Sequence, residues 1–148
     1  MEIMKSKKNK NKNEKNTIII GCGRLGSKIA NILSDRGENV LIIDKDKDSY
    51  RRLSSGFGGL TVVGNCTDFS ILEEAEIENA DVVMAVTNDD SVNIMVSQIA
   101  KTIYKTETVI ARLSDPEKRK AIDSMDIDVL CPTLLTVDAI SELLQKDA

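Results

Sequence analysis

Six consecutive residues near the start of the chain have the types and spacing of a phosphate-binding loop. They are Gly21-Cys22-Gly23-Arg24-Leu25-Gly26, a complete GxGxxG pattern. Gly21 permits a tight turn, Gly23 lets a pyrophosphate approach the backbone, and Gly26 lets a helix pack closely on a strand. A helix that begins within the motif would offer unpaired N–H groups and the positive end of its dipole to phosphates. The pattern therefore predicts a loop that holds the phosphates of a nucleotide.

An acid further along the chain supports this prediction. Asp44 lies 18 positions after Gly26, close to the spacing of about 20 expected for the acid that holds a ribose hydroxyl. A carboxylate there would repel a 2′-phosphate, which disfavours NADP, although the adjacent Lys45 could weaken that preference. We therefore expect NAD(H) or an adenine nucleotide (ATP, ADP or AMP) as the ligand.

Short apolar runs alternate with amphipathic stretches and would position this loop. The runs cover residues 17–20, 40–43, 60–63, 82–86, 108–111 and 127–131. Their continuous Val, Ile and Leu content is typical of strands that are buried on both faces of a parallel sheet. Six such strands alternating with helices predict an α/β, Rossmann-like, doubly wound fold with strand order 3-2-1-4-5-6.

The stretches between the runs have helical patterns. The first carries an apolar stripe of Leu25, Ile29, Ile32 and Leu33. Gly37 is expected just after its end. A second helix, which Asn88 or Asp89 could cap, carries a stripe of Val92, Met95, Val96, Ile99 and Ile103. Pro116 between two acids indicates the start of another helix.

Composition excludes several classes of protein. The 148 residues correspond to about one domain and contain no His, which removes His-based triads and the commonest metal ligand. The three cysteines are widely spaced, so we expect neither a zinc site nor a disulfide framework. Free thiols indicate the reducing cytoplasm.

Charge is unevenly distributed along the chain. Residues 1–16 hold six Lys and two Glu, whereas the remainder has a net charge of −8. The acidic body argues against nucleic-acid binding. The basic segment is expected to be a disordered, solvated arm, or else to contact anionic lipid or an acidic partner. It has no apolar signal region, and no run reaches the roughly 18 apolar residues of a membrane span.

Longer segments of the chain resemble a known family. These segments are IIIGCGRLGSKIANIL, VLIIDKD, VVGNCTDFSILEEAEIENADVVMAVTNDDSVN and VIARLSDPE. They are similar to the RCK N-terminal (KTN or TrkA-N) domain, the regulatory nucleotide-binding domain of potassium channels and potassium uptake systems. The resemblance covers about residues 17–145.

The resemblance assigns roles to particular residues. It implies that the three glycines form the phosphate loop and that Asp44 holds the adenosine ribose. Arg24 would contact phosphate, sometimes of the nucleotide in the dimer mate, unless it is a solvated first-turn residue. Asn65 and Cys66 stand where the family has an Asp-Ala pair beside adenine. The oxygen of Asn65 could still accept a hydrogen bond from the adenine amino group.

Two further groups would border the ligand at the carboxyl ends of the strands. Thr87, Asn88 and Asp89 follow the fourth strand at the expected switch point, where they either contact ligand or only cap a helix. Arg112 ends the fifth strand and matches an Arg that reaches phosphates in relatives. A salt bridge to an acid is the alternative for Arg112.

The last segment reads as one more helix. We therefore expect a tail at 1–16, a Rossmann nucleotide-binding domain at 17–131 and a C-terminal helix at 132–148. Its apolar residues are Leu134, Leu135, Val137, Ile140, Leu143 and Leu144. They would contact a partner or cover the sheet's own face. In RCK domains the corresponding helix crosses to a neighbouring subunit, which implies a homodimer or a higher RCK assembly here.

The sequence carries no visible catalytic apparatus, because it lacks His, a nucleophile beside a base, and clearly paired carboxylates. We expect a nucleotide-sensing regulatory subunit rather than an enzyme. It would be cytoplasmic and held at the inner face of the membrane by an integral potassium-transport protein. The alternatives are a minimal NAD-dependent oxidoreductase and a soluble nucleotide sensor with another client.

Overall fold

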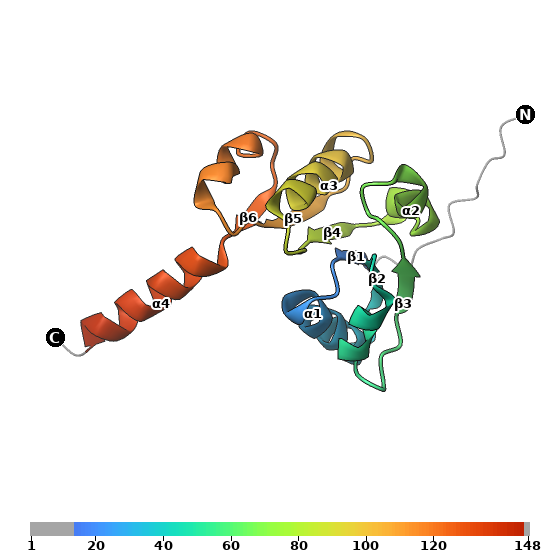
Figure 1. Cartoon of the computed structure of the whole chain (residues 1–148), viewed down its shortest axis with the longest axis horizontal. Helices are drawn as coiled ribbons and strands as arrows, with labels where there is room; N and C mark the ends of the chain where they lie inside the picture. The colour runs from blue at the N-terminus through green and yellow to red at the C-terminus, as the bar shows by residue number, and fades with distance from the viewer. Residues whose placement is uncertain (1–13, 147–148) are drawn as a thin grey trace, which may run out of the picture.

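Six parallel strands form one sheet in the order β3-β2-β1-β4-β5-β6 (Figure 1). This confirms the predicted doubly wound fold. The strands of this computed structural model are β1 (Asn16–Ile20), β2 (Asn39–Asp44), β3 (Leu60–Val63), β4 (Val82–Ala85), β5 (Thr108–Arg112) and β6 (Asp128–Leu130). The structure describes residues 14–146, so most of the segment expected to form a tail lies outside the described residues.

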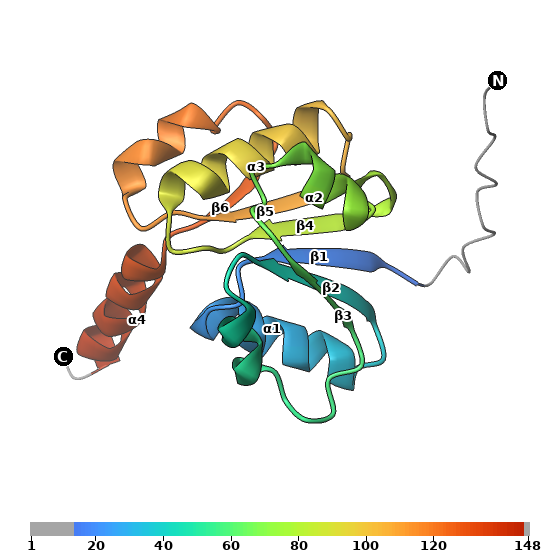
Figure 2. The ribbon, with the colours of Figure 1, turned by 45° about the vertical axis from the view of Figure 1, so that its right-hand side comes forward.

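Helices cover both faces of the sheet (Figure 2). One face carries α1 (Arg24–Asp35) and the 3-10 helix η1 (Lys47–Arg52), and the other carries α2 (Phe69–Glu74) and α3 (Asp90–Thr102). The remaining elements are η2 (Ile77–Asn79), η3 (Pro116–Ala121) and α4 (Pro132–Lys146).

Side chains of the central strand β1 contribute to two hydrophobic cores, one on each face of the sheet. Successive side chains of a strand point to opposite faces. Ile19 accordingly belongs to the core on the α1 side, with Ala30. Ile18 belongs to the core on the α2 and α3 side, with Leu72 and Val96. The apolar run therefore fills both cores, as its lack of polar alternation predicted.

The helix ends confirm the predicted caps. Gly37 has a φ of +72°, and its N–H donates to the Ser34 carbonyl at 2.9 Å. The Glu38 N–H donates to the Leu33 carbonyl at 3.0 Å, which completes a Schellman motif at the end of α1. At the start of α3, the Asp89 carboxylate accepts from the Ser91 N–H at 2.9 Å.

The predictions of burial are wrong in part for three elements. Leu60 and Val63 of β3 are 67% and 49% exposed, because β3 is a short edge strand flanked only by β2. Met95 and Ile103 of α3 are also exposed, and so is Ile32 of α1. The buried side of α3 also carries polar residues, Asp90, Asn93 and Ser97, which form hydrogen bonds within the fold.

Helix α4 projects away from the sheet (Figures 1 and 2). None of its described residues is buried, and its six apolar side chains are 44% to 67% exposed. The helix therefore does not cover the sheet's own face. Among residues 14–146, no helix has both the length and the apolar character needed to cross a bilayer.

Candidate functional site

The three motif glycines occupy positions with different steric demands. A Cβ on Gly26 would lie 1.9 Å from the Gly21 carbonyl oxygen, so only glycine lets α1 pack this closely on the loop. Gly21 itself has a φ of +105°, which L side chains rarely adopt. A Cβ on Gly23 would meet nothing within 4 Å. The backbone at Gly23 therefore faces open space, as a phosphate-binding position requires.

Asp44 is tied directly to this loop. Its Oδ2 accepts from the Cys22 N–H at 2.8 Å, and its Oδ1 accepts from the Asp46 N–H at 2.8 Å. The Asp44 N–H in turn donates to the Tyr50 hydroxyl at 2.9 Å. A carboxylate can accept about four hydrogen bonds, so Asp44 shapes the loop and keeps lone pairs for a ligand.

A cleft of about 510 Å³ opens at the carboxyl ends of β1, β2, β3 and β4, and we call it the first cleft. Ten of the fourteen predicted site residues line it. They are Gly21, Cys22, Gly23, Asp44, Lys45, Asn65, Cys66, Thr87, Asn88 and Asp89. The fold thus brings together four chain segments that are separated in the sequence.

A larger cleft of about 850 Å³, the second cleft, adjoins the first. Arg24, Leu25 and Arg112 line it, together with apolar residues of β4 to β6 and the first turn of α4. Gly26 is the one predicted residue that lines neither cleft, because it packs against Gly21.

Arg112 lines the second cleft and carries a buried polar atom that lacks a partner in the described part of the chain. Its Nε is buried and has no hydrogen-bond partner among the described residues. No ion pair to Arg112 is present in residues 14–146, so the salt bridge considered from the sequence is not formed there. A buried, unpartnered guanidinium nitrogen is costly, and a phosphate or carboxylate of a ligand would relieve it.

The turn after β5 is fixed by a buried acid. The carboxylate of Asp90, which is 7% exposed, accepts from the N–H groups of Ser114 at 2.8 Å and Asp115 at 3.0 Å. Burial by itself raises the pKa of Asp90. These hydrogen bonds and the charge of Lys118 outweigh it, so the pKa is lowered overall. Asp90 therefore stays ionised and orders the segment that follows Arg112.

Asn93 is the structural residue of the site that sequence reasoning missed. It is fully buried, and its Oδ1 accepts from the Thr87 N–H at 2.9 Å and the Thr87 hydroxyl at 2.7 Å. Its Nδ2 donates to the carbonyls of Thr87 at 3.0 Å and Arg112 at 2.8 Å. Asn93 thus joins the ends of β4 and β5. A polar residue between Val92 and Val96 on the buried side of a helix was the available signal.

Asn65 presents a different group from the one expected. Its Oδ1 accepts from the Thr67 N–H at 3.0 Å and the Thr67 hydroxyl at 2.7 Å. The carbonyl oxygen is therefore engaged within the turn, and the amide N–H₂ is the group left to meet a base.

The two cysteines in the first cleft are buried, free thiols. Burial, reinforced by the charge of Asp44, raises the pKa of Cys22 to about 11 against the opposing effect of Arg52. Burial also raises the pKa of Cys66. Both thiols are therefore neutral near pH 7. No group of three or more potential metal-ligating side chains gathers within the part of the chain that the structure describes.

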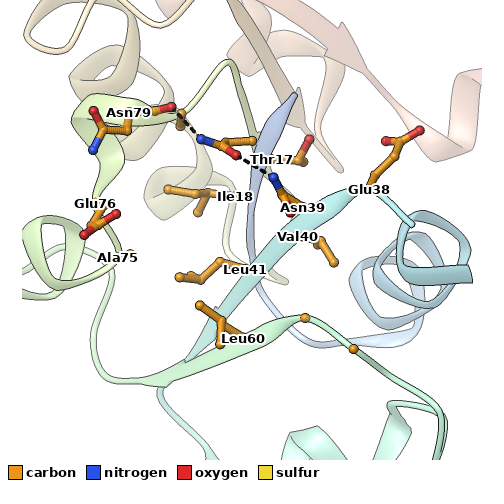
Figure 3. A pocket seen from close by; sticks show the side chains of 14 residues that line it. Thr17, Ile18, Glu38, Asn39, Val40, Leu41, Leu60, Ala75, Glu76 and Asn79 are labelled. Carbon is orange, nitrogen blue, oxygen red and sulfur yellow. Dashed lines mark hydrogen bonds between the residues drawn. The ribbon is translucent and has the colours of Figure 1, made fainter. Parts of the chain in front are cut away.

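A third cavity, of about 260 Å³, lies at the amino ends of β1, β2 and β3, whereas the first cleft lies at their carboxyl ends (Figure 3). There the Asn39 amide donates to the Asn16 side-chain oxygen at 3.2 Å, and the Asn16 amide donates to the Asn79 carbonyl at 3.3 Å. None of the predicted site residues lines this cavity.

A known protein family matches most of the chain. The family model of the TrkA-N domain matches residues 17–132. The chain belongs to the TrkA-N domain family.

The chain is also similar to curated proteins named as Trk potassium uptake proteins. The chain is 40% identical over 120 residues to the Trk system potassium uptake protein TrkA of Streptomyces coelicolor, covering 81% of this chain and 52% of the relative. It is 36% identical over 108 residues to the TrkA homolog of Pyrococcus abyssi, covering 73% of this chain and 48% of the relative. The chain thus spans about half the length of these relatives.

Solved structures share the fold of this TrkA-N domain. The TrkA-N domain of the inner membrane protein ybaL from Escherichia coli superposes with a TM-score of 0.78 at 19% identity, covering 87% of this chain and 96% of that one. The structure of GsuK bound to ADP gives a TM-score of 0.74 at 23% identity, covering 90% of this chain and 35% of that one. At these identities the likeness establishes the fold alone.

Proposed function

We propose that this TrkA-N domain is a nucleotide-sensing regulatory subunit of a potassium uptake system or channel. The observation that carries the proposal is the first cleft, where the open backbone of Gly23 lies beside the carboxylate of Asp44. A glycine loop at a helix N-terminus accommodates phosphate, and an acid at the end of the second strand accommodates ribose.

The residues that line the two clefts fit an adenine nucleotide. The glycine loop would hold the pyrophosphate, and Asp44 would accept from the ribose hydroxyls. The amide of Asn65 would donate to a ring nitrogen of adenine. Arg24 and Arg112, in the second cleft, would meet phosphate, and the unpartnered Nε of Arg112 supports that role. Thr87, Asn88 and Asp89 would close the switch point between β1 and β4.

The charged residues that line the first cleft favour nucleotides without a 2′-phosphate. Asp44, Asp46 and Asp89 line the first cleft against Lys45 and Arg52. A 2′-phosphate beside Asp44 would be repelled, so NAD(H), ATP, ADP or AMP is favoured over NADP. The ADP bound by the structurally similar GsuK supports an adenine nucleotide.

Helix α4 supports the proposal of a homodimer. Its apolar side chains are exposed along its length, which indicates a surface covered by a partner. Its first turn, through Pro132 and Leu135, lines the second cleft together with Gly23 and Arg24. A nucleotide that reached this cleft would therefore favour one orientation of α4, and with it one arrangement of two subunits.

The partner that would receive this signal is an integral potassium-transport protein at the cytoplasmic face of the membrane. The naming of the curated relatives as Trk potassium uptake proteins supports this partner. We propose a binding and signalling role without catalysis, because the described lining of the two clefts contains no general base paired with a nucleophile.

Thermal-shift titration tests the proposal. A ligand that binds the folded state raises its stability by RT ln(1 + [L]/Kd). We expect NADH, ATP, ADP or AMP to raise the melting temperature, and NADPH to do so least. Asp44→Asn removes the charge but keeps an oxygen that can accept from the Cys22 N–H. It should weaken nucleotide binding and reduce the difference between the melting-temperature shifts produced by NADH and NADPH.

Asp48→Ala is the matched control, because the Asp48 side chain is 79% exposed and, among residues 14–146, forms an ion pair only with Arg51, three residues further along η1. It should leave the titration unchanged. The absence of any shift with all five nucleotides would refute the proposal. Turnover of NADH with a small carbonyl substrate would favour an oxidoreductase instead.

A further inference from the structure

The two clefts share part of their lining, and we call the shared residues the neck. Among the described residues, Gly23, Arg52, Val86 and Asn88 are the ones that line both clefts. Arg52 is the one charged residue among these four. It lies at the end of η1, outside the glycine motif and outside the segments that carried the sequence-based site prediction.

The proposed binding mode would place the diphosphate of a nucleotide at the neck. Asp44 and Asn65 lie in the first cleft, and the open backbone of Gly23 lies in the neck itself. A nucleotide with its ribose at Asp44 and its pyrophosphate over Gly23 therefore brings two negative charges to the neck.

Arg52 is available to meet those charges. Within residues 14–146, its guanidinium takes part in no ion pair, whereas that of Arg51 pairs with Asp48 at 3.9 Å. The second cleft, which Arg52 shares with Arg24 and Arg112, has no acidic residue in its described lining. The positive electrostatic potential of the second cleft therefore favours the binding of phosphate groups.

The backbone that carries Arg52 is fixed to the phosphate loop and to α1. The Asn31 amide donates to the Arg52 carbonyl at 3.4 Å, and the Asn31 oxygen accepts from the Ser54 N–H at 2.9 Å. The Cys22 thiol donates to the Ser49 carbonyl at 3.4 Å. The backbone around Arg52 is therefore already ordered before a ligand binds, and such preorganisation favours affinity.

We propose that Arg52 binds the diphosphate group of the nucleotide at the neck, together with Gly23, and so acts as a further binding residue of this site. The inference rests on the proposed function. It adds a residue of η1 to a site that is otherwise built from the glycine loop and the carboxyl ends of β2, β3, β4 and β5.

The test measures ADP and adenosine affinities by isothermal titration calorimetry in the parent, Arg52→Ala, Arg52→Lys and Arg51→Ala proteins. A charge-assisted hydrogen bond to phosphate corresponds to about a tenfold or greater change in affinity. We expect Arg52→Ala to weaken ADP binding by about that factor, and Arg52→Lys to recover part of it. Arg51→Ala should stay within about twofold of the parent because Arg51 lines neither cleft.

Adenosine separates phosphate binding from a structural role. Loss of Arg52 as a phosphate ligand leaves adenosine affinity unchanged, whereas a distorted first cleft weakens adenosine and ADP together. Equal loss for both ligands, or ADP affinity in Arg52→Ala within about twofold of the parent, would overturn the inference. A parent protein that binds neither ADP nor the other nucleotides refutes the proposed function itself, and the role of Arg52 with it.

Discussion

Replacement of Asn93 by Ala is the most direct test of how the switch point is built. Asn93 makes four hydrogen bonds, three to Thr87 and one to the Arg112 carbonyl. Each contributes about 1 kcal/mol to stability. The side chain is fully buried, so water cannot readily replace the lost partners. We therefore expect the free energy of unfolding to fall by about 3–4 kcal/mol.

Urea denaturation of the ligand-free protein measures this loss. The midpoint should fall with little change in the m-value, because the surface exposed on unfolding is nearly the same. The melting temperature should fall by about 10 °C for a domain of this size. ADP affinity should fall as well, because Thr87 and Arg112 are no longer held at a fixed separation.

Thr102→Ala is the control within the same helix, because the Thr102 hydroxyl is exposed and its one hydrogen bond to a described residue goes to the Gln98 carbonyl. Its effect should stay within about 0.5 kcal/mol, as for most surface substitutions. A loss below about 1 kcal/mol for Asn93→Ala would refute the reasoning, because the network would then contribute no more than one ordinary hydrogen bond.

Three other predictions follow from the geometry. Gly26→Ala should prevent stable folding or lower stability by about 3 kcal/mol or more, whereas Gly56→Ala, whose Cβ would meet nothing within 4 Å, should be tolerated in the same unfolding assay. The pKa of Asp90 is lowered in the folded state, so its carboxylate stabilises the fold above the unfolded pKa of about 4 and this contribution is lost as pH falls through the folded pKa. The stability difference between the parent and Asp90→Asn should therefore be largest at neutral pH and shrink on acidification, and a pH-independent difference would contradict the assignment. With the other two cysteines replaced by Ser, Cys22 should react with iodoacetamide only slowly at about pH 8, because a pKa of about 11 leaves about one thiol in a thousand ionised. Rapid alkylation of the folded protein at that pH would show that the thiol is neither buried nor neutral.

Local sequence determined the fold and most of the site. The GxGxxG motif, the apolar runs and Asp44 each follow from steric or packing rules that act over a few residues. In a parallel sheet all strands point the same way, so residues at their carboxyl ends must gather at one edge. Thr87 could be placed at the first cleft for that reason, without coordinates. The resemblance to the TrkA-N family assigned Asn65 and Arg112 to the ligand.

Tertiary structure alone decided which polar groups are engaged and which are free. The sequence did not show that Asp44 accepts from the Cys22 N–H or that Asn93 joins the ends of β4 and β5. It also did not show that Arg52 lines both clefts. These facts depend on hydrogen bonds and packing between segments about 20 residues apart or more, and no periodicity along the chain encodes such contacts. The apolar pattern of α4 likewise predicted a helix and a buried face, but only the fold showed that its own sheet does not cover it.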